Sequence, residues 1–361
     1  MSIIERKNLV SDLIDFECTV DGVPFPFLTG LEYQHTVDSA RVIKASVSGI
    51  EPIALLTIGS KVVIKVGTNE TTHNLDFKGV VTQIMPSFAE SEIVAVDYVT
   101  HLQTSEIVNY KEQDLLGKDL YYLAADACNY KGIDTSELLE GSGIKATKDM
   151  GLAGFQTRRR FIKKCFDYLT PVVKSNDYSE VVALQWRYAI RRNNVMDFWL
   201  EDHKNFKSEP VLTITETNNT LIGPGVVSNI NSTQMVNSAM YLSSVNSNVF
   251  VTVSDEDSIE KHGIKGKLVL NTSERLDRLE ELAYINVLLH KTPTVTYRIT
   301  MNNAEYITLG DYIKINIESF GKDILLPVVQ VNHVITDRVE STIVVGTPEL
   351  SITEYISSSL E

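Results

Sequence analysis

The acidic segment Ser254–Ser258 contains residue types that can bind a metal ion. Its three carboxylates could ligate a hard cation such as Ca²⁺. The segment lacks the ligand spacing of an EF-hand loop and the glycine that such a loop needs at its sharp turn. Ser254, with Asp257 three residues later, instead fits a helix N-cap, where acidic side chains complement the helix dipole. The sequence therefore favours the start of a helix over a metal site.

The most basic stretch of the chain is a second candidate for chemistry. Contact with a phosphate or a nucleic acid is one interpretation of such a stretch. Base-reading side chains are not interleaved with the cations, and the whole chain carries a formal charge of −14. These features favour the solvated face of a helix, or ion pairs with an acidic neighbouring subunit. The stretch comprises Arg158, Arg159, Arg160, Lys163 and Lys164.

The histidines, serines and carboxylates do not form a recognisable catalytic motif. The seven histidines include no HExxH pair and no cluster with zinc-ligand spacing, and there is no GxSxG, Walker or GxGxxG motif. His262 and His333 are expected in turns or strands. Glu280 and Glu281 fall on a predicted helix, although two carboxylates brought together in space for glycoside cleavage stay an open alternative. No catalytic, cofactor-binding or metal-binding residue is predicted, and no cofactor.

Four aromatic residues gather on one predicted hairpin. Such a cluster could bind a sugar or a protein partner, but packing in a hydrophobic core explains it more simply. The four residues are Trp186, Tyr188, Phe198 and Trp199.

The composition is that of an ordinary globular protein, with 361 residues, 43% of them apolar and 22% charged. This length suggests two or three domains. The excess of 47 acidic over 33 basic residues argues against a general nucleic-acid binder. Cys18, Cys128 and Cys165 are too far apart for a disulfide framework or a CxxC site, and they suit a reducing compartment. No secretory signal and no apolar run long enough to span a bilayer is expected.

The pattern along the chain predicts an α+β protein that is mainly β, with α insertions. Residues 1–108 are predicted to form a first antiparallel β-barrel. The expected strands, rich in Val, Ile and Thr and separated by Gly, Asn and Pro, are Leu13–Val20, Ser39–Ser48, Lys61–Val66, Phe77–Ile84 and Glu92–Val99.

Residues 109–208 are predicted to form a small α/β module between the strand-rich regions. One helix carries Leu116–Ala127 and stops by Gly132, and a second runs from about Thr157 to Leu169. A hairpin follows, with strands Val181–Ile190 and Val195–Asp202.

Residues 209–350 are predicted to form a second barrel with a helical insertion at about 252–292. Asn271 and Glu274 have capping-box spacing. The helix should then bury one face and end by Pro293. Residues 351–361 form a Ser-rich tail that is expected to be loose. The predicted apolar face consists of Leu276, Leu279, Leu282, Ala283, Asn286 and Leu289.

The two strand-rich regions resemble each other in order, which indicates an internal duplication. Gly59 and Gly310 each precede a strand and could form a tight turn. The alternative is chance, because all strands favour Val and Ile. Four blocks recur: 38–43 with 237–242, 58–64 with 309–315, 81–84 with 328–331, and 92–96 with 341–345.

Such a duplication suggests a geometric role. Three copies of a chain with two similar barrels can place six barrels in a ring. One face of this ring would match a six-fold partner, while the other would present true three-fold symmetry.

The chain also resembles a known family, the late control protein D family of baseplate hub proteins in contractile phage tails. This family is similar in turn to the N-terminal hub part of type VI secretion VgrG spike proteins. Asp257–Gly263 resembles the pattern Asp-x-x-Ser-Ile-x-Lys-Tyr-Gly, with two departures: His262 replaces the aromatic residue, and Asp257 directly precedes Ser258. Further matches follow in the family's order: 96–98, Leu102, 123–124, 132–133, 155–169, 235–239, 309–311 and 331–333.

The resemblance implies two barrels of tail-tube type in a homotrimeric ring that joins a hexameric tail tube to a trimeric central spike. The spike would be a separate polypeptide, because the chain ends soon after the second barrel. The expected neighbours include the tape measure and other baseplate proteins, with DNA passing through the lumen without specific binding. The resemblance implies a structural virion protein of the tail baseplate, assembled in the bacterial host cytoplasm, with no membrane contact and no enzymatic activity.

Two alternatives stay open. A tail-associated cell-wall hydrolase would release soluble fragments from peptidoglycan. A carbohydrate-binding attachment protein would use the aromatic hairpin as its platform and lose glycan binding on Trp199→Ala.

Overall fold

The structure of the chain is a computed structural model. It describes residues 14–68, 75–103, 106–138, 141–169, 184–191, 194–202, 209–217, 221–243, 246, 248–271, 276–318 and 321–346. The predicted C-terminal tail lies outside these ranges, as do Leu13, the first three residues of the predicted 181–190 strand, and Glu274 of the predicted capping box.

The N-terminal unit is a six-stranded arrangement with neighbours in the order β3-β4-β7-β6-β5-β1. A two-residue strand, β2 (Val23–Pro24), extends it beyond β1. Buried and exposed residues alternate along β4 and β7, as expected for strands with one face on a core. The strands are β1 (Ile14–Val20), β3 (Leu28–Thr36), β4 (Val42–Ser48), β5 (Lys61–Thr68), β6 (Leu75–Met85) and β7 (Glu90–Asp97).

The C-terminal unit repeats this strand order as β13-β17-β20-β19-β18-β12. The one difference in direction is at the end, where β1 is antiparallel to β5 and β12 is parallel to β18. The strands are β12 (Leu212–Thr215), β13 (Leu221–Asn231), β17 (Thr294–Asn302), β18 (Tyr312–Ile317), β19 (Gly321–Ile335) and β20 (Val339–Gly346).

A β-bulge occurs at the same place in both units. The register of β6 against β7 shifts between Val81 and Gln83, and that of β19 against β20 shifts between Val328 and Gln330. These residues belong to the third recurring block of the sequence. Bulges are specific local features, so their coincidence supports the predicted duplication.

The turn before β5 also recurs before β18. Gly59 and Gly310 have φ values of +93° and +78°, a region that glycine adopts without strain. The Gly59 amide donates to the Val81 carbonyl over 2.8 Å, and the Gly310 amide donates to the Val328 carbonyl over 2.9 Å. The second recurring block therefore encodes the same turn twice, as predicted.

The predicted correspondence of 38–43 with 237–242 is wrong. Residues 237–242 do not belong to the C-terminal unit but to β14 (Ser238–Ser243), in a separate three-stranded sheet. The counterpart of β4 is instead β17, which lies after this insertion. The insertion is also larger than the predicted 252–292, because it contains β14, β15 (Phe250–Ser254), α6 (Glu256–His262), β16 (Gly266–Asn271) and α7 (Leu276–His290).

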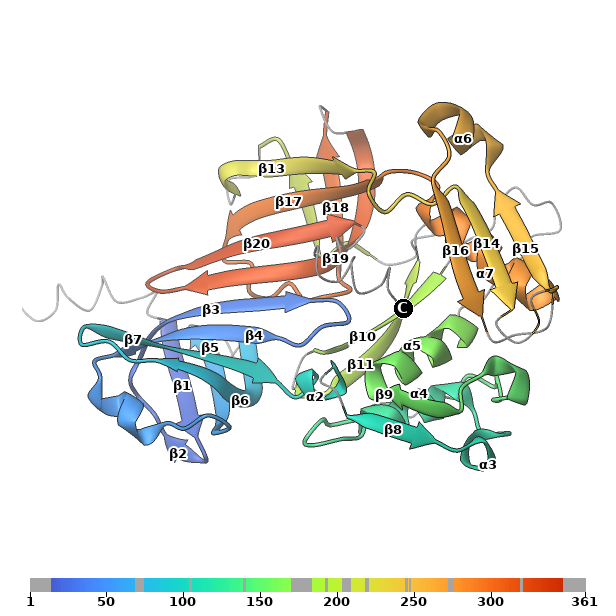
Figure 1. Cartoon of the computed structure of the whole chain (residues 1–361). Helices are drawn as coiled ribbons and strands as arrows, with labels where there is room; N and C mark the ends of the chain where they lie inside the picture. The colour runs from blue at the N-terminus through green and yellow to red at the C-terminus, as the bar shows by residue number, and fades with distance from the viewer. Residues whose placement is uncertain are drawn as a thin grey trace, which may run out of the picture.

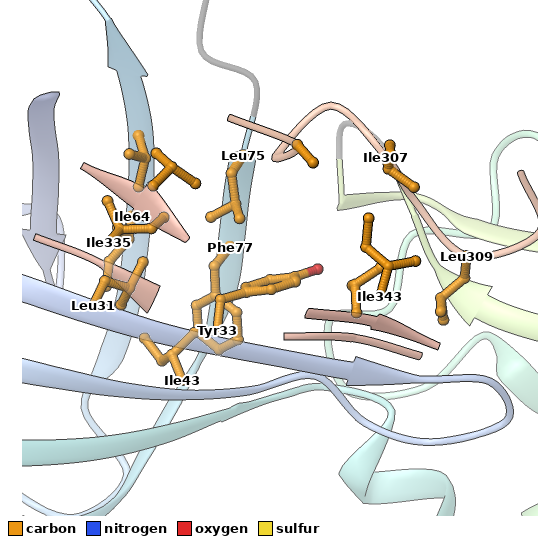
Figure 2. Packing of buried hydrophobic residues seen from close by; sticks show 14 of the residues in the cluster. Leu31, Tyr33, Ile43, Ile64, Leu75, Phe77, Ile307, Leu309, Ile335 and Ile343 are labelled. Carbon is orange, nitrogen blue, oxygen red and sulfur yellow. The ribbon is translucent and has the colours of Figure 1, made fainter. Parts of the chain in front are cut away.

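The two units are joined edge to edge, because β19 pairs with β3. Figure 1 shows the strands from β13 to β4 stacked as one continuous sheet. A single hydrophobic core runs through both units, and Figure 2 shows Tyr33 and Phe77 of the first near Ile343 of the second. Among the described residues this sheet ends at β2, at β12 and at β13, without closing on itself, so the predicted arrangement of two barrels is not confirmed.

A second hydrophobic core lies mainly in the middle module and also includes Tyr98, Val99 and Leu102. The predicted helices are present as α4 and α5, and the predicted hairpin as β10 and β11. The module's elements are α2 (Thr100–Gln103), β8 (Ile107–Tyr110), α3 (Glu112–Leu115), α4 (Leu120–Cys128), β9 (Gly154–Thr157), α5 (Arg158–Leu169), β10 (Leu184–Ile190) and β11 (Met196–Asp202).

Strand β3 was not predicted from the sequence. The buried face of α7 also differs from the predicted one, because α7 buries Leu279, Ala283 and Val287 while Leu276 is exposed. All three cysteines are free and buried. Among the described residues, no helix is both long and apolar enough to cross a bilayer.

Candidate assembly interfaces

The junction between the two units is a six-residue antiparallel ladder between 330–335 of β19 and 31–36 of β3. Alternate residues on both strands are buried, because the ladder places them over the common core. In β3 these are Leu31, Tyr33 and His35, and in β19 they are Val331, His333 and Ile335.

Two buried histidines lie within this junction. Tyr33 stacks on His333 with ring centroids 5.6 Å apart, and its hydroxyl lies 3.4 Å from Nδ1 of His35. Nδ1 of His333 lies 2.9 Å from the Ser341 hydroxyl. Burial lowers the pKa of His333 to about 4 and that of His35 well below its usual value, with Arg41 adding repulsion at His35. Both imidazoles are therefore neutral at pH 7.

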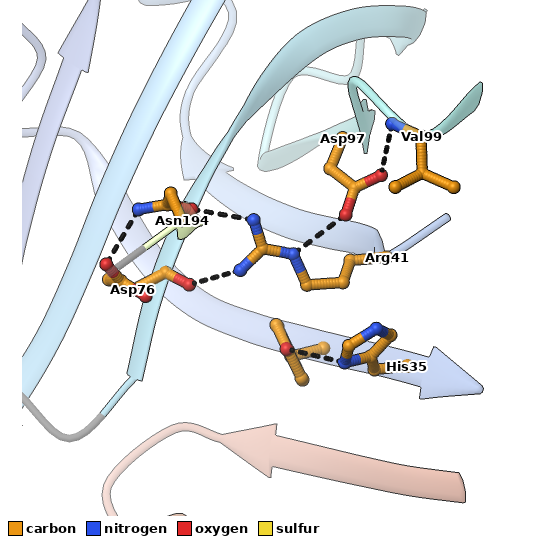
Figure 3. Close-up of polar contacts among 7 residues, drawn as sticks. His35, Arg41, Asp76, Asp97, Val99 and Asn194 are labelled. Carbon is orange, nitrogen blue, oxygen red and sulfur yellow. Dashed lines mark hydrogen bonds and ion pairs between the residues drawn. The ribbon is translucent and has the colours of Figure 1, made fainter. Parts of the chain in front are cut away.

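Arg41 connects the N-terminal unit to the middle module (Figure 3). Its Nε donates to the Asp97 carboxylate over 2.8 Å, while its other nitrogens donate to the Asp76 carbonyl and to Oδ1 of Asn194. Asn194 in turn donates to the Asp76 carboxylate over 2.7 Å. Asp97 also accepts from the Val99 amide. This network fixes the β10–β11 hairpin against β4 and β6.

The same hairpin contacts both units. Arg187 forms an ion pair with Asp38 over 2.9 Å, and the Tyr188 amide donates to the same carboxylate. On the other strand Trp199 lies under the Gly310 turn, where a Cβ on Gly310 would be 2.9 Å from the indole nitrogen. The middle module therefore contacts both units through this hairpin.

A small cavity lies between Arg41, His35 and Glu305, with a volume of about 30 Å³. That volume has room for about one water molecule. It is far from the several hundred Å³ that a ligand the size of a drug or a short peptide needs.

Among the described residues, two of the sheet edges without a partner strand are on β13 and on the end of β6. β13 pairs only with β17, and beyond Val81 β6 has no paired strand on its β5 side. Ile230 on β13 is 70% exposed. Natural sheets usually protect exposed edges, so these two mark candidate contacts with other chains.

The three-stranded sheet of the insertion has a second candidate surface. α7 covers the face that carries Ala239 and Tyr241. The opposite face is apolar and exposed, since Met240 pairs with Leu268 and Leu242 pairs with both Phe250 and Leu270. The large exposed residues of this face are Met240, Phe250, Leu268 and Leu270.

The basic stretch forms part of α5, as predicted, and several of its cations bind within the chain. Arg158 lies over the Tyr130 ring at 4.1 Å and donates to the Ala127 carbonyl. Lys164 donates to the Gly151 carbonyl over 3.0 Å. These contacts favour a structural role over nucleic-acid binding.

The acidic segment starts helix α6, as predicted, but the cap is one residue later. Asp255 is the N-cap residue, because its carboxylate accepts from the Ser258 amide over 2.9 Å. The same carboxylate pairs with Lys291 over 2.7 Å. Among the described residues, no three His, Cys, Asp or Glu side chains are grouped to hold a metal ion.

The remaining residues that the sequence singled out, the aromatic residues, the histidines and the glutamates, do not come together in one site among the described residues. Tyr188 and Phe198 are buried in the module's core, which confirms the core interpretation for them, and Trp186 packs against that core. His333 is in a strand, as predicted, while His262 ends helix α6. Glu281 pairs with Arg278 over 3.1 Å on α7.

No protein-family model matches the sequence, and no curated protein matches it significantly. Similar folds do occur among solved structures. A tail protein from Neisseria meningitidis MC58 matches with a TM-score of 0.61 at 9% identity, over 92% of this chain and 96% of that one. The 43 kDa tail protein of prophage MuSo2 from Shewanella oneidensis matches with 0.60 at 10% identity, over 92% and 98%.

A third match is prophage tail protein gp18 from Listeria monocytogenes EGD-e, with a TM-score of 0.52 at 15% identity, over 96% of this chain and 98% of that one. The chain has the fold of these tail proteins. Nearly the full length of each is covered, so the likeness includes both units, the module and the insertion. At such low identity it establishes the architecture and no individual residue's role.

Proposed function

We propose that this chain is a structural subunit of a phage tail or a related contractile injection particle, and specifically its baseplate hub. The observation that carries the proposal is the repeated six-stranded unit, with the same strand order and the same bulge in each copy. The fold shared with tail proteins supports it.

The proposed mechanism is geometric. Three chains would contribute six similar units to a ring, which gives a hexameric tail tube six equivalent contacts. The insertion and the middle module occur once per chain, so they would present three-fold symmetry to a trimeric central spike. The spike is proposed to be a separate polypeptide, and the tape measure and other baseplate proteins are further partners.

The lumen of this ring is proposed to pass DNA without specific binding. The chain's formal charge of −14 supports this idea if part of the acidic excess faces the channel, where it would repel a polyanion. A map of an assembled ring with neutral or basic lumen walls would contradict it.

The proposed location is the tail baseplate of the virion, after assembly in the bacterial host cytoplasm. The role is proposed to be non-enzymatic, and the aromatic residues that a sugar-binding surface would need are largely occupied in packing. We also propose that the chain divides into regions 1–108, 109–208 and 209–350. The first and third regions would each form one barrel of the assembled ring.

Electron microscopy of the purified chain at high concentration tests the proposal. We expect class averages of a closed ring with six similar densities and three-fold symmetry. Rings with any other number of chains, or filaments, would contradict the hub assignment.

A further inference from the structure

The repeated unit allows residues of one unit to be matched with residues of the other, position by position. The residue that follows each bulge begins a row of directly paired residues that crosses four neighbouring strands. In the N-terminal unit this row is Gln83, Val94, Lys44 and Glu32, and in the C-terminal unit it is Gln330, Val344, Arg298 and Val227.

This matching makes β13 the counterpart of β3, and β6 the counterpart of β19. Since Glu32 corresponds to Val227, His35 corresponds to Ile230 and Thr36 to Asn231. Since Gln83 corresponds to Gln330, Ile84 corresponds to Val331.

The junction within the chain uses these positions. His35 lies directly opposite Val331, and both are almost fully buried, with 3% and 1% of their side chains exposed. In the part of the chain that the structure describes, no strand covers the outer side of their counterparts Ile230 and Ile84. Ile84 is only partly buried, and Ile230 is 70% exposed although it is apolar. Each unit therefore carries both edges of such a junction. Within the chain one edge of each unit is used, β3 and β19, and the other edge of each, the end of β6 and β13, stays unpaired among the described residues.

We propose that β6 of one copy pairs with β13 of a second copy of this chain, in the register of the β19–β3 ladder. Ile84 would then lie opposite Ile230 of the neighbour, and Gln83 opposite Asn231. The contact is head to tail, so each copy keeps one β6 edge and one β13 edge for its two neighbours, and the chain of contacts can close into a ring. The inference rests on the proposed function and specifies the contact between its subunits.

The sequence limits the length of this ladder. Pro86 takes the position that His333 has in the junction, and proline has no amide proton to donate. The intermolecular ladder should therefore be shorter than the six-residue junction and should depend strongly on the Ile84–Ile230 pair. Association between copies should accordingly be reversible.

Cysteine cross-linking tests the register. In the double variant Gln83→Cys/Asn231→Cys, directly opposite residues should form disulfides between copies under mild oxidation. The three native cysteines are buried, so they should not compete. The matched control Gln83→Cys/Val227→Cys moves the second cysteine four residues along β13, a shift of about 13 Å, and should not cross-link.

A second pair of variants tests the apolar contact without cross-linking. Ile230→Lys should weaken self-association about tenfold or more. It removes an isoleucine that the proposed contact would bury and places a charge there. Ile264→Lys, at an equally exposed isoleucine outside both edges, should leave it unchanged. Both sites are exposed, so both variants should fold.

The outcomes separate this inference from the proposed function. Disulfides in the 83/231 variant alone support both. A three-chain assembly without these disulfides overturns the edge pairing and leaves the hub proposal standing. Cross-linking by Asn231→Cys alone would show symmetric β13–β13 pairing and overturn the inference. If the chain shows no association and no cross-linking at any concentration, the edge pairing and the hub proposal are both overturned.

Discussion

Nε of Arg41 donates a hydrogen bond to the carboxylate of Asp97 over 2.8 Å, with only 1% and 0% of the two side chains exposed. Removing one partner of a buried pair leaves the other charge uncompensated, which costs about 3–5 kcal/mol. We therefore expect Asp97→Asn to lower the free energy of unfolding, measured in urea, by that amount.

The neighbouring pair Lys44–Glu92, 2.9 Å apart with 46% and 36% of the two side chains exposed, is the control. Glu92→Gln should cost less than about 1 kcal/mol. Equal losses in the two variants would contradict the structural role of the buried pair.

The buried histidines of the junction predict a loss of stability in mild acid. His333 has its pKa lowered from 6.5 to about 4, so between these pH values the unfolded chain binds a proton that the folded chain does not. The free energy of unfolding should hold above pH 6.5 and fall as the pH drops towards 4, by about 3 kcal/mol from this residue.

His333→Gln is the comparison. It should be less stable than the parent at pH 7 and should lose less stability between pH 6.5 and 4. Parallel pH profiles for the two proteins would rule out His333 as a source of this effect.

The two repeated turns give a matched pair of glycine substitutions. Both glycines have positive φ, so alanine should cost about 1–2 kcal/mol at either site. A Cβ at Gly59 meets nothing within 4 Å, whereas at Gly310 it comes within 2.9 Å of Trp199. Gly310→Ala should therefore lower the free energy of unfolding by clearly more than Gly59→Ala. Equal effects would contradict the close packing of the module under this turn.

The parts of the fold that the sequence predicted are those with local signals. The Gly59 and Gly310 turns were predicted because a glycine directly before a strand is itself a turn signal. The helix of the middle module at Arg158–Leu169 was predicted from its apolar stripe, since its pattern is contained within four turns.

The parts that were missed depend on distant chain segments. β3 alternates Glu32 and Gln34 with Tyr33 and His35, and the burial of the last two depends on β19, about 300 residues later. The contact of Arg41 with Asp97 likewise joins residues 56 positions apart. Without pairing information, β14 was mistaken for the counterpart of β4, because short strands of similar composition are alike.

The mass of the purified chain in solution, measured by light scattering over a concentration series, tests the ring most directly. We predict that the mass rises from that of one 40.4 kDa chain to a plateau at three times this value. A single-chain mass at every concentration, or a plateau at two chains, would contradict the ring.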